Sequence, residues 1–200
     1  DAPDSFPLGE TTITWTATDS SGNSSTATQT VSVVDTTPPS ITAPSTVQVE
    51  ATGIEGNLAD IGTSTASDYV EIISITNNAP DSFPLGETTI TWTATDSSGN
   101  FAIATQTVSV VDTSAPSITA PSTVQVEATG IEGNLADIGQ ANGFDFVEII
   151  SITNDAPDSF PLGETTITWT ATDSSGNSAT ATQTVSVVDT TSPTLTVPEN

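Results

Sequence analysis

A 77-residue internal repeat constrains the fold of this chain more than any other feature of its sequence. The segment DSFPLGETTITWTATDSSGN begins at Asp4 and returns unchanged at Asp81 and Asp158. A second segment, ITAPSTVQVEATGIEGNLADIG, runs from Ile41 and again from Ile118. Self-similarity at a fixed period is typical of a tandem array, and a unit of this length is large enough to form its own core.

Proline-containing linkers, DTTPP, DTSAP and DTTSP, mark the expected boundaries between the repeats. They predict the C-terminal half of a repeat over 1–35, complete domains over 36–112 and 113–189, and the first strand of a further repeat over 190–200. This organisation predicts a slice of a longer chain. Donation of strands between subunits is the alternative that the same pattern leaves open.

Apolar and hydroxyl residues alternate along 12–18 and 26–33, on either side of the turn Asp19–Asn23. Such a period of two is typical of half-buried strands and predicts a β-hairpin. Further strands are expected at 41–43, 47–51 and 69–75, and no segment shows helical periodicity. We therefore expect an all-β fold: tandem immunoglobulin-like antiparallel β-sandwich domains in an elongated array, with Trp92 and Trp169 as core anchors.

The composition excludes several classes of function. The chain has no Lys, Arg, His, Cys or Met, and its 25 acidic residues give a net charge of −25. Without cations it cannot neutralise the phosphates of nucleic acid or bind an anionic membrane surface. Ser-His-Asp, Cys-His and lysine Schiff-base catalysis also lack their residues, so we expect no enzyme. No apolar run is long enough to predict a membrane span.

The order of motifs within each unit resembles the hyalin repeat (HYR) family. These motifs are the linker Asp with Pro, ITAP, a short strand ending in Glu, an A-x-D, FPLGETTITWTATDSSGN and a closing VSVVD. The resemblance implies immunoglobulin-like modules of extracellular or cell-surface proteins. The family often carries a Cys pair at positions matching Ala43 with Ala104 and Ala120 with Ala181, so it implies a disulfide-free version here.

Acidic residues recur at the predicted ends of strands near each linker. In an antiparallel sandwich we expect five oxygen-bearing side chains to meet at each junction: Asp35, Glu50, Asp68, Asp96 and Asn100 at the first, and Asp112, Glu127, Asp145, Asp173 and Asn177 at the second. Calcium takes about 6–8 oxygen ligands and tolerates irregular geometry, whereas magnesium is stricter and zinc usually takes His or Cys. The sequence therefore predicts Ca²⁺ at the junctions. The alternative is that Asp19, Asp96 and Asp173 only cap hairpin turns while the other acids are solvated.

These features favour a structural extracellular segment, rigidified by calcium, that forms a stalk, a matrix component or the body of a surface filament. Its expected partners are neighbouring repeats or other copies of itself. The alternative is an adhesin that binds a protein or a glycan, through the divergent stretch 140–146 with Phe144 and Phe146. An accessory region of a secreted hydrolase is least favoured. The threonine-rich strand faces could carry O-linked glycans, and one weak N-glycosylation sequon begins at Asn23.

Overall fold

The computed structural model describes residues 2–197, and all regular elements within them are strands. These described residues hold no helix, and so none that is long and apolar enough to cross a membrane. They cluster into two compact units, one made of 2–47, 60–80 and 89–108 and the other of 48–59, 81–88 and 109–197. The predicted all-β class is confirmed.

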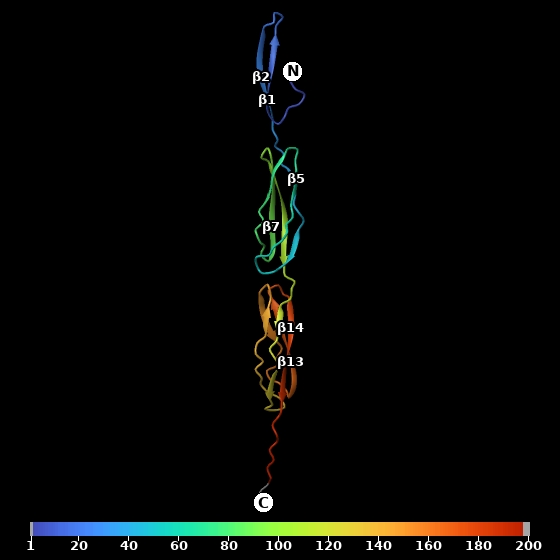
Figure 1. Ribbon diagram of the computed structural model, residues 1–200, viewed down its shortest axis with the longest axis vertical. Coiled ribbons are helices and arrows are strands. Elements are labelled where there is room, and N and C mark those ends of the chain that lie inside the picture. The colour runs from blue at the N-terminus through green and yellow to red at the C-terminus, as the bar shows by residue number, and fades with distance from the viewer. Residues whose placement is uncertain (1, 198–200) are drawn as a thin grey trace. The chain divides into compact units, whose positions relative to one another are not determined.

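The repeat 113–189 contains a four-stranded and a two-stranded sheet. The larger sheet has the order β10-β14-β13-β12, formed by Val124–Glu127, Ser178–Val188, Gly163–Asp173 and Ile149–Asn154. The long strands β13 and β14 pair antiparallel over their whole length (Figure 1). β12 pairs antiparallel with β13, whereas β10 pairs parallel with β14. The smaller sheet pairs β9 (Ser117–Thr119) antiparallel with β11 (Asn142–Phe144).

The core of this repeat lies between the two sheets. Alternate residues of β13 and β14, including Ile167, Trp169 and Val185, are buried, as the period of two predicts. Ile118 and Ala120, in and just after β9, pack against them. The prediction of an immunoglobulin-like β-sandwich with Trp169 as a core anchor is confirmed, and Ala120 packs where the family often has a Cys.

The repeat 36–112 has the same set of strands. The sheet order is β4-β8-β7-β6, with β3 beside β5. The bounds are Ser40–Thr42 (β3), Val47–Glu50 (β4), Thr65–Ser67 (β5), Ile72–Asn77 (β6), Gly86–Asp96 (β7) and Phe101–Val111 (β8). A register shift lies between Ile72 and Ser74, as it does between Ile149 and Ser151. Trp92 is buried like Trp169.

Residues 2–35 form the predicted hairpin of β1 (Gly9–Thr18) and β2 (Ser24–Val33) (Figure 1). Gly22 has φ of +87° in the turn, a conformation that favours glycine. Trp15, which matches Trp92 and Trp169, is half exposed because the described residues supply no second sheet over this hairpin.

Some predicted strand bounds were wrong. The strand expected from Tyr69 begins at Ile72, because Asp68 Oδ1 accepts the backbone N–H groups of Tyr69 and Val70 and turns the chain there. Strands β5 and β11 were not predicted, since their sequences TAS and NGF show no alternation. Residues 190–197 form no strand, and 198–200 lie outside the described residues.

In each complete repeat a buried glutamine on the last strand hydrogen-bonds two loops and the core tryptophan. Gln183 Nε2 donates to the carbonyls of Ser122 and Ile138 at 3.0 Å, and its Oε1 accepts the indole N–H of Trp169 at 3.0 Å. Gln106 makes the same three contacts in its own repeat. In the hairpin, Gln29 accepts the indole N–H of Trp15 at 3.1 Å but is exposed.

We expect Gln183→Leu to destabilise the protein by about 2 kcal/mol, because it leaves the buried indole N–H of Trp169 and two partly buried carbonyl groups without partners. Urea unfolding followed by tryptophan fluorescence measures the loss. The matched change Gln29→Leu should leave the transition unchanged, since that contact is exposed. Equal effects of the two changes would contradict the role assigned to Gln183.

Candidate metal centre

Asp173 closes the β13–β14 turn and carries a fully buried carboxylate. Its Oδ1 accepts the N–H groups of Ser175 at 2.9 Å and Asn177 at 2.8 Å, and its Oδ2 accepts Asn177 Nδ2 at 3.0 Å. Burial opposes ionisation, but the hydrogen bonds from Asn177 and the turn outweigh it, so the pKa of Asp173 lies below its ordinary value. The buried group is therefore an anion at neutral pH.

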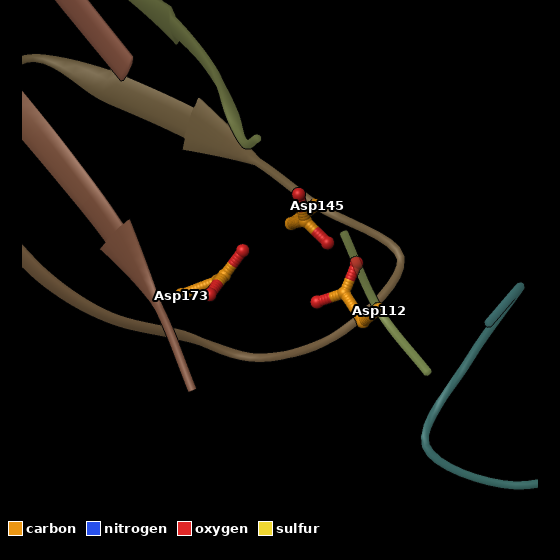
Figure 2. Close-up of side chains that lie close together, drawn as sticks. All are labelled: Asp112, Asp145 and Asp173. Carbon is orange, nitrogen blue, oxygen red and sulfur yellow. The ribbon is translucent and has the colours of Figure 1, made fainter. Parts of the chain in front are cut away.

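Two further aspartates converge on Asp173. Asp112 directly follows β8 and is the first residue of the linker. Asn177 Nδ2 donates to the backbone carbonyl oxygen of Asp112 at 3.2 Å and to Asp112 Oδ2 at 3.5 Å. Asp145 follows β11, and its Oδ1 accepts the N–H of Val147 at 2.8 Å. Each of the three aspartates offers one carboxylate oxygen within 4.8 Å of the other two. Figure 2 shows the three carboxylates pointing into one common space.

This spacing suits a hard divalent cation. Two oxygens that each lie about 2.4 Å from one calcium ion are at most about 4.8 Å apart. Three carboxylates this close repel one another, and the chain has no Lys, Arg or His to offset them. The amide of Asn177 stands beside Asp112 and Asp173 through its Nδ2, and turning the amide over would present its Oδ1 as a fourth ligand. The donor set is all oxygen, as calcium prefers.

Part of this arrangement recurs in the repeat before it, although among the described residues only Asp112, Asp145 and Asp173 bring three carboxylates within 4.8 Å of one another. Asn100 Nδ2 donates to Asp35 Oδ2 at 3.1 Å and to Asp96 Oδ2 at 2.9 Å, and Asp96 is fully buried. Burial opposes ionisation there too, but hydrogen bonds from Asn100 and the turn keep the pKa of Asp96 below its ordinary value. Asp68 Oδ2 is buried and has no hydrogen-bond partner in the described structure. An unpartnered carboxylate oxygen is costly to bury, which suits a cation ligand.

Glu50 and Glu127 do not join these clusters, so their predicted placement was wrong. The prediction assumed that the second strand of the repeat returns toward the linker that precedes it. Instead, β10 runs parallel to β14 and pairs Glu127 with Val188. The turn at Asn177 lies at the other end of β14, about 35 Å away at the rise of a strand.

Glu50 instead holds the linker that follows its own repeat. Its Oε1 accepts the N–H of Thr113 at 2.8 Å and the hydroxyl of Ser114 at 2.9 Å, and its Oε2 accepts the hydroxyl of Thr113 at 2.9 Å. Glu127 holds Thr190 and Thr191 in the same way. The sequence signal for this role was the recurrence of each Glu 63 residues before a linker hydroxyl pair.

The capping role weighed as the alternative is present in all three hairpins. Asp19 accepts the N–H groups of Ser21 and Asn23 at 2.9 Å, as Asp96 and Asp173 do in their own turns. Asn23, the predicted sequon residue, is exposed and donates its Nδ2 to Asp19 Oδ2 at 3.0 Å. Capping uses only Asp173 of the three aspartates, so it does not account for the approach of Asp112 and Asp145.

The divergent stretch 140–146, which we expect to bind a partner if the chain is an adhesin, contains Asp145. Phe144 and Phe146 are both exposed, and their rings meet edge to face with centroids 5.5 Å apart. Ser67 and Tyr69 hold the equivalent positions one repeat earlier. The aromatic pair is therefore a feature of one repeat.

Comparison with known proteins identifies a family. A model of the HYR domain matches residues 34–110 and again 111–187. Hyalin of Strongylocentrotus purpuratus is 40% identical over 98% of this chain and 18% of its own length. Hyalin of Lytechinus variegatus is 40% identical over 98% of this chain and 40% of its own length. The chain therefore spans less than half the length of these curated relatives.

Among solved structures, mouse clustered PcdhgC3 EC1-3 gives a TM-score of 0.37 at 14% identity, covering 91% of this chain and 78% of that one. Drosophila N-cadherin EC1-3 gives a TM-score of 0.29 at 16% identity, covering 94% and 91% respectively.

We expect the chemical shift of the Thr113 amide proton to change with pH as Glu50 is protonated, with an inflection below the ordinary glutamate pKa of about 4.3. The Thr113 N–H, followed by the hydroxyls of Ser114 and Thr113, lowers the pKa of Glu50. This linker contact is complete above the ordinary pKa and is lost as the pH falls through the lowered one. Two-dimensional ¹⁵N–¹H spectra measure the shift. Glu50→Gln should abolish it, and an inflection at or above the ordinary value would refute the contact.

Proposed function

Because the chain belongs to the HYR domain family of extracellular and cell-surface repeats, we propose that it is a structural segment whose junctions are rigidified by calcium. It would serve as part of a stalk, a matrix component or the body of a surface filament. Its domains would be 36–112 and 113–189, preceded by half a repeat, and its partners neighbouring repeats or other copies. No reaction is assigned, because the His, Cys and Lys on which Ser-His-Asp, Cys-His and Schiff-base sites depend are missing.

The observation that carries this proposal is the convergence of Asp112, Asp145 and Asp173 to within 4.8 Å in a chain without cationic side chains. The three aspartates come from different places: the linker, the loop after β11 and the end of β13. An ion bound to all three would join the linker to the body of the repeat that follows it. Rigidity would then depend on calcium, because within residues 2–197 the amide of Asn177 is the one side chain that hydrogen-bonds both Asp112 and Asp173.

The linker would be held from both sides. Asp112 would be bound through the ion to residues 145 and 173 of the following repeat, while Glu50 of the preceding repeat binds Thr113 and Ser114 directly. A linker of a few residues held on both sides has little conformational freedom left, which is how a joint becomes stiff. Asp35, Asp68, Asp96 and Asn100 would do the same at the first junction.

We expect Asp145→Asn to weaken calcium binding at the second junction by at least about tenfold, since it removes one of three carboxylates from the site. The matched control is Asp158→Asn, which changes the net charge equally at an exposed carboxylate. Calorimetric titration with Ca²⁺ measures the affinity. If the two variants bind calcium as the parent chain does, or if the parent binds none, the calcium proposal is wrong.

The second candidate function, an adhesin, is favoured by the exposed Phe144 and Phe146 beside this site. Tyr and Phe side chains on a surface are common anchors of protein and glycan interfaces. The partner would contact the loop after β11.

Phe144→Ser installs the residue that the preceding repeat carries at this position. Because Phe144 is exposed, we expect the unfolding transition and calcium affinity to stay unchanged. A glycan array probed with both chains then separates the two functions. Signals that the parent chain gives and the variant loses would support an adhesin, whereas identical patterns would favour the structural role.

A further inference from the structure

Two identical segments of the chain differ in how deeply they are buried. Residues 51–58 and 128–135 both read ATGIEGNL, yet Ile54 is 50% exposed and its counterpart Ile131 is 80% exposed. Leu85 is also partly buried, whereas its counterpart Leu162 is exposed. The local sequence is the same, so something outside the segment covers Ile54 and Leu85.

The backbone at Phe146, in the repeat that follows, lies beside this loop. Residues 48–59, 81–88 and 109–197 form one compact unit, and within it the carbonyl oxygen of Phe146 lies 4.0 Å from the position a Cβ would take on Gly53. Phe146 is 65% exposed, whereas Tyr69, its counterpart one repeat earlier, is 99% exposed. The loop at Gly53 and Ile54 and the loop at Phe146 therefore cover each other.

We propose that this contact is a second, ion-independent part of the joint: an apolar seat at the end of one repeat that receives the aromatic residue next to the junction aspartate of another. The seat consists of the loop 51–58 with Leu85, and its occupant is Phe146. The inference builds on the repeat junction of the proposed function but does not require calcium there.

The equivalent loop of the next repeat, residues 128–135 with Leu162, shows the shape of the seat without an aromatic residue of the described chain in it. At the end of the repeat 113–189, a cavity of about 230 Å³ is lined by Thr129, Gly130, Ile131, Leu162 and Asp189, among others. It accepts an apolar group from outside, because Ile131 and Leu162 are exposed there. Its partner is a further repeat of this kind with Tyr or Phe directly after its junction aspartate, as in Asp68-Tyr69 and Asp145-Phe146.

Spin labels report the joint directly, because the chain contains no Cys of its own. Thr105→Cys and Thr182→Cys introduce labels at equivalent exposed positions of the two complete repeats. Pulsed electron–electron double resonance, recorded in the presence of a chelator, measures the distribution of distances between the two labels. We expect Phe146→Ala to broaden this distribution, and Tyr69→Ala, at the uncovered counterpart, to leave it unchanged.

Phe146 is mostly exposed, so its truncation should not unfold the repeat, and an unchanged Trp169 fluorescence spectrum checks this. If Phe146→Ala leaves the distribution as narrow as in the parent chain, or if Tyr69→Ala broadens it equally, the seat is wrong. Adding Ca²⁺ separates the two proposals. A broadened Phe146→Ala distribution that calcium does not narrow would support the seat and count against calcium at the joint.

Discussion

A surplus of negative charge with no cation of the chain's own is the constraint on which this structure depends. Each carboxylate that leaves water needs an N–H group, a hydroxyl or an external cation, because an unpaired buried charge is costly. Asp173 uses the N–H groups of its turn, and Glu50 uses the backbone and hydroxyls of the linker. Where Asp112 and Asp145 approach Asp173, the nearest donor between them is the amide of Asn177. This is the place where a cation from solution would lower the free energy most.

The direction of one short strand decides which charges meet. Because β10 runs parallel to β14, the repeat carries its aspartates at the end where β14 begins and its glutamate at the end where β14 finishes. The two ends are therefore different and complementary. A linker that leaves one repeat beside a glutamate enters the next beside aspartates, and both ends bind it through its backbone or side chains. A head-to-tail array of such units repeats this arrangement at every junction.

The strands of the larger sheet were predictable from the sequence, whereas of the smaller sheet only β3 was predicted and β5 was not. The alternation of Ile167, Trp169 and Ala171 reports burial on one face directly, so the hairpin strands and the core tryptophan follow from it. Strands β5 and β11 have three residues each and are defined by pairing with β3 and β9, which leaves no periodic signal. Asp173 lies at the end of β13, where the sequence pattern puts it, because the hairpin turn positions it locally. The glutamates were misplaced because the parallel pairing of β10 with β14 is a long-range choice that no local pattern reports.

The divergence between the two complete repeats is informative about which residues the joint needs. The stretch that changes from TSTASDY to QANGFDF keeps only its aspartate and the aromatic character of the residue that follows it. The changed residues include strands β5 and β11, and apart from the buried pair Ser64 and Ala141 they are exposed or partly exposed, where replacement costs little stability. Asp145 lies among the neighbouring carboxylates, and the backbone carbonyl of Phe146 lies beside the loop at Gly53. Phe144 is not needed for the fold, since the preceding repeat forms the same strands with Ser67 in its place. Phe144 can therefore be replaced without changing Phe146, so the aromatic pair proposed for binding can be broken while the residue proposed for the joint stays.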